Sequence, residues 1–204
     1  LDPTVFVDVS IPEEVVYNRA LEIAMTNPDV TVDYNGERIR FKQGFAEYIE
    51  RVADGKNFWR FTVDEPNIQA EFFVIPEAFP DDTERMFTWV NSSYLYDGGK
   101  CNTQFFNAFF DRVLTTLEPA ARKSKCKITR SDVKSGVAVF ANIKLQNPEY
   151  DSQSKTRLTG PDLRVDISSM LDADWKAFTK KNDDWITSIV ERTLIEVHTK
   201  ENKQ

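Results

Sequence analysis

The chain has 204 residues, of which 41% are hydrophobic, and its 26 Lys and Arg against 33 Asp and Glu leave a net charge of −7. This composition excludes a mainly disordered chain, because 15 Phe and 4 Trp supply enough apolar surface for a core. No apolar run approaches the roughly 20 residues that a membrane span needs, so we expect a soluble protein with no membrane partner. The acidic balance argues, at first sight, against a protein that mainly binds nucleic acid.

Residues that support common catalytic chemistry are scarce. Cys101 and Cys126 are too few for a disulfide scaffold, which favours a reducing, cytoplasmic compartment. The single histidine, His198, makes a histidine triad or a multi-histidine metal site improbable, so we expect no metal site. The GxxxxGK[ST] and GxGxxG phosphate loops are also missing. Because the chain starts with Leu1 rather than Met, we expect it to be a fragment of a longer protein.

Periodicity and turn residues predict alternating strands and helices in the first half of the chain. The expected elements are a strand over 5–9, a helix between Pro12 and Pro28, a hairpin over 30–41 that turns at Asn35-Gly36, a helix over 45–52, a hairpin over 57–75, and a strand over 86–90.

The second half contains the clearest helix, from Asn102 to Leu117, where four phenylalanines recur at helical spacing. A strand over 137–145, a polar segment over 146–161 and a helix over about 174–198 follow. We therefore expect one α+β domain over residues 1–172 and a long C-terminal helix within 173–204.

Charge is distributed unevenly along the chain. Residues 64–97 hold eight acids and one base, which equals the whole net charge of −7. Residues 120–134 are basic, and a solvated face is the simplest explanation for both segments. A basic block after an amphipathic helix is also a candidate contact for a phosphate backbone. The candidate DNA contacts are Arg122, Lys123, Lys125, Lys127, Arg130 and Lys134.

The segment from Asn147 to Leu158 reads Asn-Pro-Glu-Tyr-Asp-Ser-Gln-Ser-Lys-Thr-Arg-Leu. It resembles the signature Asn-Pro-x-Phe-x-Ser-Gln-Thr-Lys-x-x-Leu of the transducer domain of type IIA DNA topoisomerases, the family of gyrase B, topoisomerase II and the large subunit of T4-like phages. Val90-Asn91, Asp97-Gly98-Gly99 and the segment 132–136 are similar to other family motifs in the same order. Leu95 and Cys101 depart from the usual Thr and His, and the segment 158–161 leans toward the phage branch.

The resemblance implies a ribosomal-protein-S5-domain-2-like α+β fold with a mainly four-stranded sheet. It implies that Gln153 and Lys155 act at the γ-phosphate of ATP, which is bound in a preceding GHKL ATPase domain, and that Mg²⁺ is not bound by this chain. A TOPRIM domain, double-stranded DNA and a second protomer of a homodimer are the other implied partners. The fragment alone is expected to be inactive, and the parent enzyme to work in the cytoplasm, or in the host cytoplasm if phage-encoded.

Two other interpretations remain open. The chain could be a non-catalytic interaction or scaffold domain, because a fold alone does not determine a function. It could also be the equivalent module of another GHKL ATPase, such as a MutL-like protein. The Ser-Gln-Ser-Lys spacing and Gly98-Gly99 resemble topoisomerase II more closely. Without the family match, residues 146–157 are an ordinary solvated loop.

Overall fold

The computed structural model describes residues 2, 4–5, 10–77, 85–160 and 167–201. Most of the strand expected over 5–9 therefore lies outside the described residues, as do Asp81, Asp82 and Glu84 of the acidic segment.

Among the described residues, five strands form the central sheet, in the order β3-β4-β7-β5-β6. The neighbours pair antiparallel except β5 and β7, which are parallel. Four strands have six to eight residues, which matches the expected mainly four-stranded sheet, and β6 adds two residues at one edge. The bounds are β3 Trp59–Glu65, β4 Ile68–Ile75, β5 Arg85–Val90, β6 Ser93–Tyr94 and β7 Ala138–Leu145.

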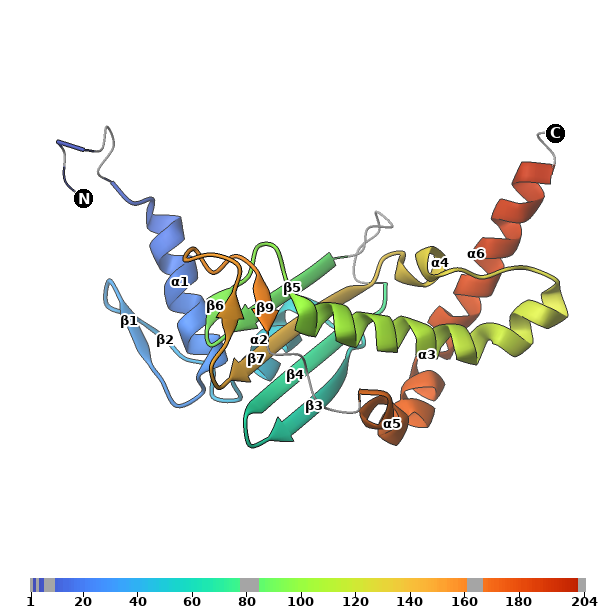
Figure 1. The fold of residues 1–204 in the computed structure, drawn as a ribbon, viewed down its shortest axis with the longest axis horizontal. Coiled ribbons are helices and arrows are strands. Elements are labelled where there is room, and N and C mark those ends of the chain that lie inside the picture. Colours follow the sequence, from blue (N-terminus) through green and yellow to red (C-terminus); the bar gives the residue numbers. More distant parts are fainter. Residues whose placement is uncertain (1, 3, 6–9, 78–84, 161–166, 202–204) are drawn as a thin grey trace.

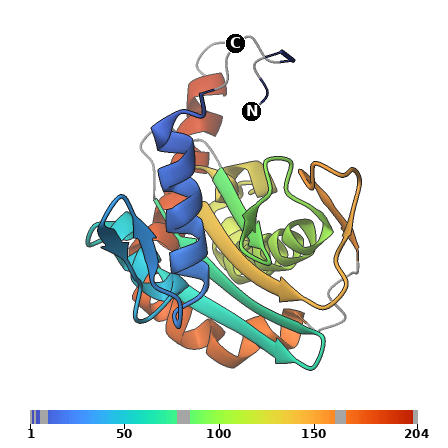
Figure 2. The same ribbon diagram turned by 90° about the vertical axis from the view of Figure 1, so that its left-hand side faces the viewer.

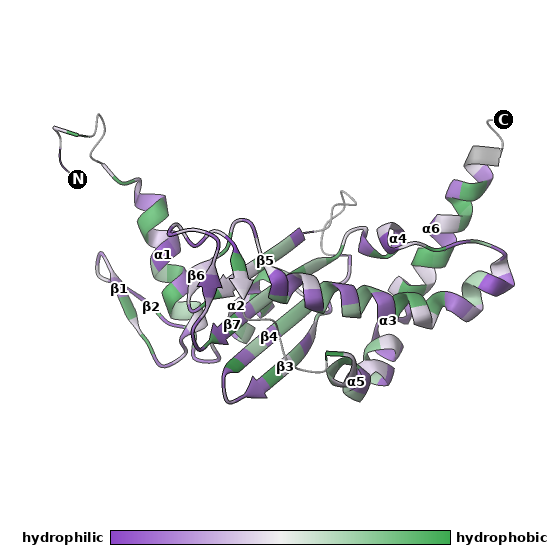
Figure 3. Cartoon of the chain, viewed as in Figure 1, coloured by the Kyte–Doolittle hydropathy of each residue, from purple (hydrophilic) through white to green (hydrophobic). Residues whose placement is uncertain are grey.

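Helices cover both faces of this sheet (Figures 1 and 2). On one face, helices α3 (Lys100–Ser124), α5 (Ile167–Lys181) and α6 (Asp183–Glu201) enclose the larger apolar cluster. Phe72 of β4 and Phe105 of α3 stack there with ring centroids 4.1 Å apart. On the other face, α1 (Glu13–Thr26), α2 (Phe45–Ala53) and a hairpin pack around Phe73 and Phe140. Figure 3 shows the resulting apolar stripes along the strands and α3.

The first hairpin is shorter than expected, with three-residue strands β1 (Val32–Tyr34) and β2 (Glu37–Ile39). Asn35 and Gly36 both have positive φ angles, 52° and 84°, so the tight turn forms where it was predicted.

Helix α3 is longer at both ends than the expected helix from Asn102 to Leu117. Its last two turns continue through Pro119, and most of their residues are exposed, so they carry no apolar period that a sequence pattern could reveal. The helix ends at Lys125, whose φ is +54° and whose N–H donates to the carbonyls of Ala121 and Arg122.

The single C-terminal helix expected over 174–198 is wrong, because the structure has two helices that meet at Asn182. The backbone N–H and Nδ2 of Asn182 both donate to the Phe178 carbonyl, at 3.0 and 2.9 Å. Apolar residues on both sides of the break pack on the same core, including Phe178 and Trp185, so the period hides it. The division at 172/173 falls inside α5 and stays a prediction. None of the helices in the described ranges is sufficiently long and apolar to cross a membrane.

Candidate functional site

The polar segment after β7 folds into a small hairpin of strands β8 (Glu149–Tyr150) and β9 (Leu158–Gly160). We call residues 146–157, which contain Gln153 and Lys155, the lysine loop. A turn closed by the Lys155 N–H and the Ser152 carbonyl, 3.1 Å apart, forms its tip. The side chains of Gln153 and Lys155 are both exposed at this turn. The structure thus brings together the two residues that the sequence singles out, on an accessible tip.

Lys155 is held in a defined backbone conformation, with φ at +55°. Its Nζ lies 5.7 Å from the centroid of the Tyr150 ring, a cation–π distance. Tyr150 is half-buried, and burial raises the pKa of its phenol above the ordinary value of 10.0, so the ring stays neutral. An ammonium on a flexible stem, next to an exposed Gln amide, offers hydrogen-bond donors to an anion that arrives from outside.

The two ends of the lysine loop are attached to the core by the same segment, residues 91–99. Where the loop begins, the Leu145 N–H donates to Asn91 Oδ1 at 2.9 Å, and Asn91 Nδ2 donates to the Leu145 carbonyl at 3.0 Å. Where it ends, the Leu158 N–H donates to the Gly98 carbonyl and the Asp97 N–H to the Thr156 carbonyl, both at 3.0 Å. The sequence analysis assigns no role to Asn91, although Val90-Asn91 was quoted as a motif.

The six basic candidates lie at the other end of α3, which at 25 residues is about 37 Å long. They divide into two groups. Arg122 pairs with Glu118, Arg130 pairs with Asp111 of α3, and Lys134 Nζ lies 5.4 Å from the Phe110 ring centroid. Lys123, Lys125 and Lys127 have exposed side chains. Arg130 and Lys134 belong to the short helix α4 (Arg130–Lys134).

The cavities and titratable groups add no second centre near the lysine loop. A groove of about 450 Å³ lies between the last turns of α3 and the returning chain, where Leu114, Leu117 and Ile128 line it beside Arg122 and Lys125. Within the described ranges, no three His, Cys, Asp or Glu side chains gather closely enough to hold a metal ion.

Comparison with known proteins identifies the family. The family model described as DNA gyrase B matches residues 44–204. The chain belongs to the DNA gyrase B family. The resemblance to type II topoisomerases is thereby confirmed, and the match leaves residues 1–43 uncovered.

Related sequences agree with this assignment. The B-type polypeptide of the type 2 topoisomerase of Aquifex aeolicus is 24% identical over 204 residues, which cover 95% of this chain and 26% of that protein. The mitochondrial DNA gyrase B of Arabidopsis thaliana is also 24% identical, with 91% and 28% covered. The chain therefore spans about a quarter of the length of these gyrase B relatives.

Solved structures support the α+β transducer-type fold. The 43K ATPase domain of Thermus thermophilus gyrase B superposes with a TM-score of 0.67 at 17% identity, covering 99% of this chain and 57% of that one. The ATPase and transducer domains of DNA topoisomerase II from Balamuthia mandrillaris give 0.65 at 20% identity, covering 92% and 44%.

Proposed function

We propose that this chain is the transducer module of an ATP-dependent type II DNA topoisomerase. In this role it couples ATP hydrolysis in a neighbouring GHKL domain to closure of a gate around DNA, and the lysine loop is the switch. The observation that carries the proposal is that Gln153 and Lys155 share one exposed turn whose two ends are bound to the core. Membership of the gyrase B family favours it over a scaffold domain or a MutL-like module.

The residues present fit ATP only in part. Lys155 can place a compact positive charge at a terminal phosphate, and the Gln153 amide can donate to a phosphate oxygen or orient a water molecule. The described residues offer neither a carboxylate cluster for Mg²⁺ nor an enclosed pocket at this turn for the base. We therefore infer that ATP and Mg²⁺ are bound mainly by the rest of the enzyme, with this loop reaching the γ-phosphate from outside.

Coupling then follows from a difference in affinity between two states. A loop that binds the γ-phosphate, and not the hydrolysed product, favours one arrangement of the two domains while ATP is intact. Because the lysine loop follows the buried strand β7, its movement is transmitted to the central sheet. We propose that the remaining partners are a TOPRIM domain, double-stranded DNA near Lys123, Lys125 and Lys127, and a second protomer, in a cytoplasmic enzyme.

The test is Lys155→Ala in the full-length enzyme. Removal of an electrostatic donor at a transferring phosphoryl group costs roughly 10²–10³ in rate, so we expect ATP hydrolysis to fall by about that factor. Lys42→Ala removes an exposed lysine elsewhere on the chain and serves as the matched control, with the activity of the wild type. Near-wild-type hydrolysis by Lys155→Ala would overturn the proposal.

A further inference from the structure

We propose that Asn91 and Gly99 are positioning residues for Lys155, and that together they form a clamp on the two ends of the lysine loop. The inference rests on the proposed function, because it names what holds the switch in place. Neither residue is placed at the phosphate. Both act through the backbone that leads into and out of the turn carrying Gln153 and Lys155.

The first half of the clamp is the Asn91 side chain. Strand β5 ends at Val90, and the parallel ladder with β7 continues one step further because the Asn91 N–H donates to the Ile143 carbonyl at 2.9 Å. The amide group of Asn91 then bonds both the N–H and the carbonyl of Leu145, as a neighbouring strand would. Asn91 has a φ of +47°, a conformation that Asn tolerates better than most residues. The lysine loop therefore leaves the sheet from a fixed point.

The second half is the close approach of Gly99 to Leu158. A Cβ atom at position 99 would lie 2.6 Å from Leu158 Cβ and 2.7 Å from the Leu158 carbonyl oxygen. The φ of Gly99 is 163°, an extended value, so the need for glycine here is steric. Leu158 is buried in the larger core cluster and is bonded through its N–H to Gly98. Lys155 stands three residues before Leu158, so any shift at Gly99 is passed on over a span of at most about 10 Å.

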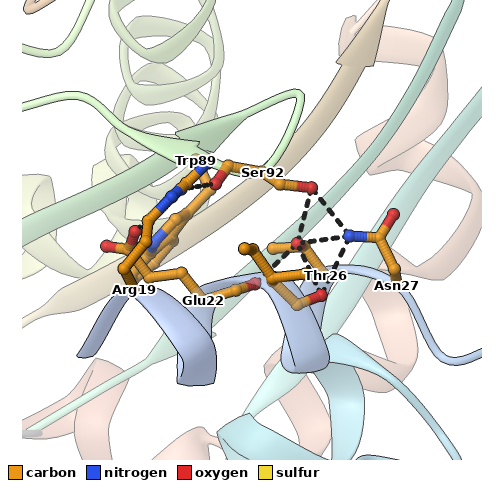
Figure 4. Close-up of polar contacts among 7 residues, drawn as sticks. Arg19, Glu22, Thr26, Asn27, Trp89 and Ser92 are labelled. Atoms are coloured by element: carbon orange, nitrogen blue, oxygen red, sulfur yellow. Dashed lines mark hydrogen bonds and ion pairs between the residues drawn. The ribbon is translucent and has the colours of Figure 1, made fainter. Parts of the chain in front are cut away.

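The clamp is also connected to helix α1 (Figure 4). The turn residue Ser92, next to Asn91, accepts hydrogen bonds on its Oγ from Thr26 Oγ1 and Asn27 Nδ2, both at 2.8 Å. Its carbonyl accepts from Arg19 Nη1. Helix α1 precedes residues 44–204, which the gyrase B family model matches. A displacement of α1 against the sheet would therefore act on the turn that carries Asn91, and through it on the start of the lysine loop.

The experiment is a double-mutant cycle on ATP hydrolysis by the full-length enzyme. Asn91→Gly keeps a residue that accepts a positive φ and removes both bonds to Leu145. Misplacement of a catalytic group by about 1 Å can cost 10²-fold, so we expect kcat to fall by about 10- to 100-fold while the KM for ATP changes less than about twofold. Gly99→Ala is expected to act in the same way. Asn35→Gly, another Asn at positive φ but in the β1–β2 turn, is the control and keeps wild-type kinetics.

The cycle separates positioning from general damage to the fold. In a Lys155→Ala background, Asn91→Gly is expected to cause no further loss, because the group that it positions is gone. Losses that multiply in the double mutant would overturn the clamp, as would wild-type kcat in Asn91→Gly. If Asn91→Gly folds poorly, the isosteric Asn91→Asp, which loses only the bond to the Leu145 carbonyl, is measured instead and is expected to lower kcat. Wild-type hydrolysis by Lys155→Ala alone would instead overturn the proposed function.

Discussion

Arg130 of α4 and Asp111 of α3 form a two-point ion pair, in which Nη2 lies 2.5 and 2.6 Å from the two carboxylate oxygens and Nε lies 2.9 Å from Oδ1. Nη1 of the same guanidinium donates to Asn107 at 3.0 Å. Arg130 therefore holds α4 against α3, and its charge is partly balanced by the carboxylate. Lys123, Lys125 and Lys127 differ from it in that their side chains extend from the last turn of α3 and the following loop with exposed ammonium groups.

We therefore predict that the three lysines contribute most of the DNA binding by this basic segment. Each phosphate contact that is lost lowers the slope of log K against log salt by about 0.9, so replacement of all three by Ala is expected to lower it by about 2 to 3. Arg130→Ala is expected to change the slope less. The measurement is fluorescence anisotropy with a short duplex and the full-length enzyme across a salt series.

The control for this experiment is the replacement of three exposed lysines of α5, namely Lys176, Lys180 and Lys181. They remove the same formal charge from another surface and are expected to leave the slope unchanged. An equal decrease in both triple variants would contradict a specific DNA-facing role for Lys123, Lys125 and Lys127.

The stacked pair Phe72 and Phe105 predicts where the fold is most sensitive. The two rings are fully buried and nearly parallel, at an angle of 1°. Phe105→Ala is expected to lower the free energy of unfolding by about 3–5 kcal/mol, because a cavity is left between the sheet and α3. Tyr96→Ala, whose side chain is 79% exposed, is expected to change it by less than about 0.5 kcal/mol. Urea denaturation of both variants tests this, and similar losses would contradict it.

Alkaline pH is predicted to destabilise the protein through its buried tyrosines. Burial raises the pKa of Tyr48, and that of Tyr94, above the ordinary value of 10.0, and the nearby Glu22 carboxylate acts in the same direction. The folded state therefore holds these protons more tightly than the unfolded state. The resulting stability is complete below pH of about 10 and is lost as the pH rises through the higher folded-state pKa.

Tyr48→Phe removes one of these protons and is expected to flatten the decline in the free energy of unfolding between about pH 8 and about pH 11. Urea denaturation at the two pH values gives the two slopes. A decline as steep in Tyr48→Phe as in the wild type would show that Tyr48 makes no contribution.

The sequence predicted those parts of the fold whose signal is local. The phenylalanines of α3 recur at helical spacing because one side of the helix is buried, and Asn35-Gly36 marks its turn by its own backbone preference. The break at Asn182 was missed because apolar residues keep helical spacing on both sides of it. The lysine loop was recognised only from a twelve-residue resemblance. The role of Asn91 could not be predicted, because its partner Leu145 lies 54 residues further along the chain.

The isolated chain of 204 residues is predicted neither to bind nor to hydrolyse ATP. At the lysine loop it offers an exposed ammonium and an exposed amide, and an exposed ion pair is worth only about 0.2–1 kcal/mol. Even a Kd of about 1 mM requires about 4 kcal/mol, which these two groups do not supply without a surface that holds the base and sugar. Isothermal titration calorimetry with a slowly hydrolysed ATP analogue is expected to give no heat of binding above that of Lys155→Ala. Micromolar affinity that disappears in Lys155→Ala would contradict the division of labour proposed here, because it would place a complete nucleotide site within this chain.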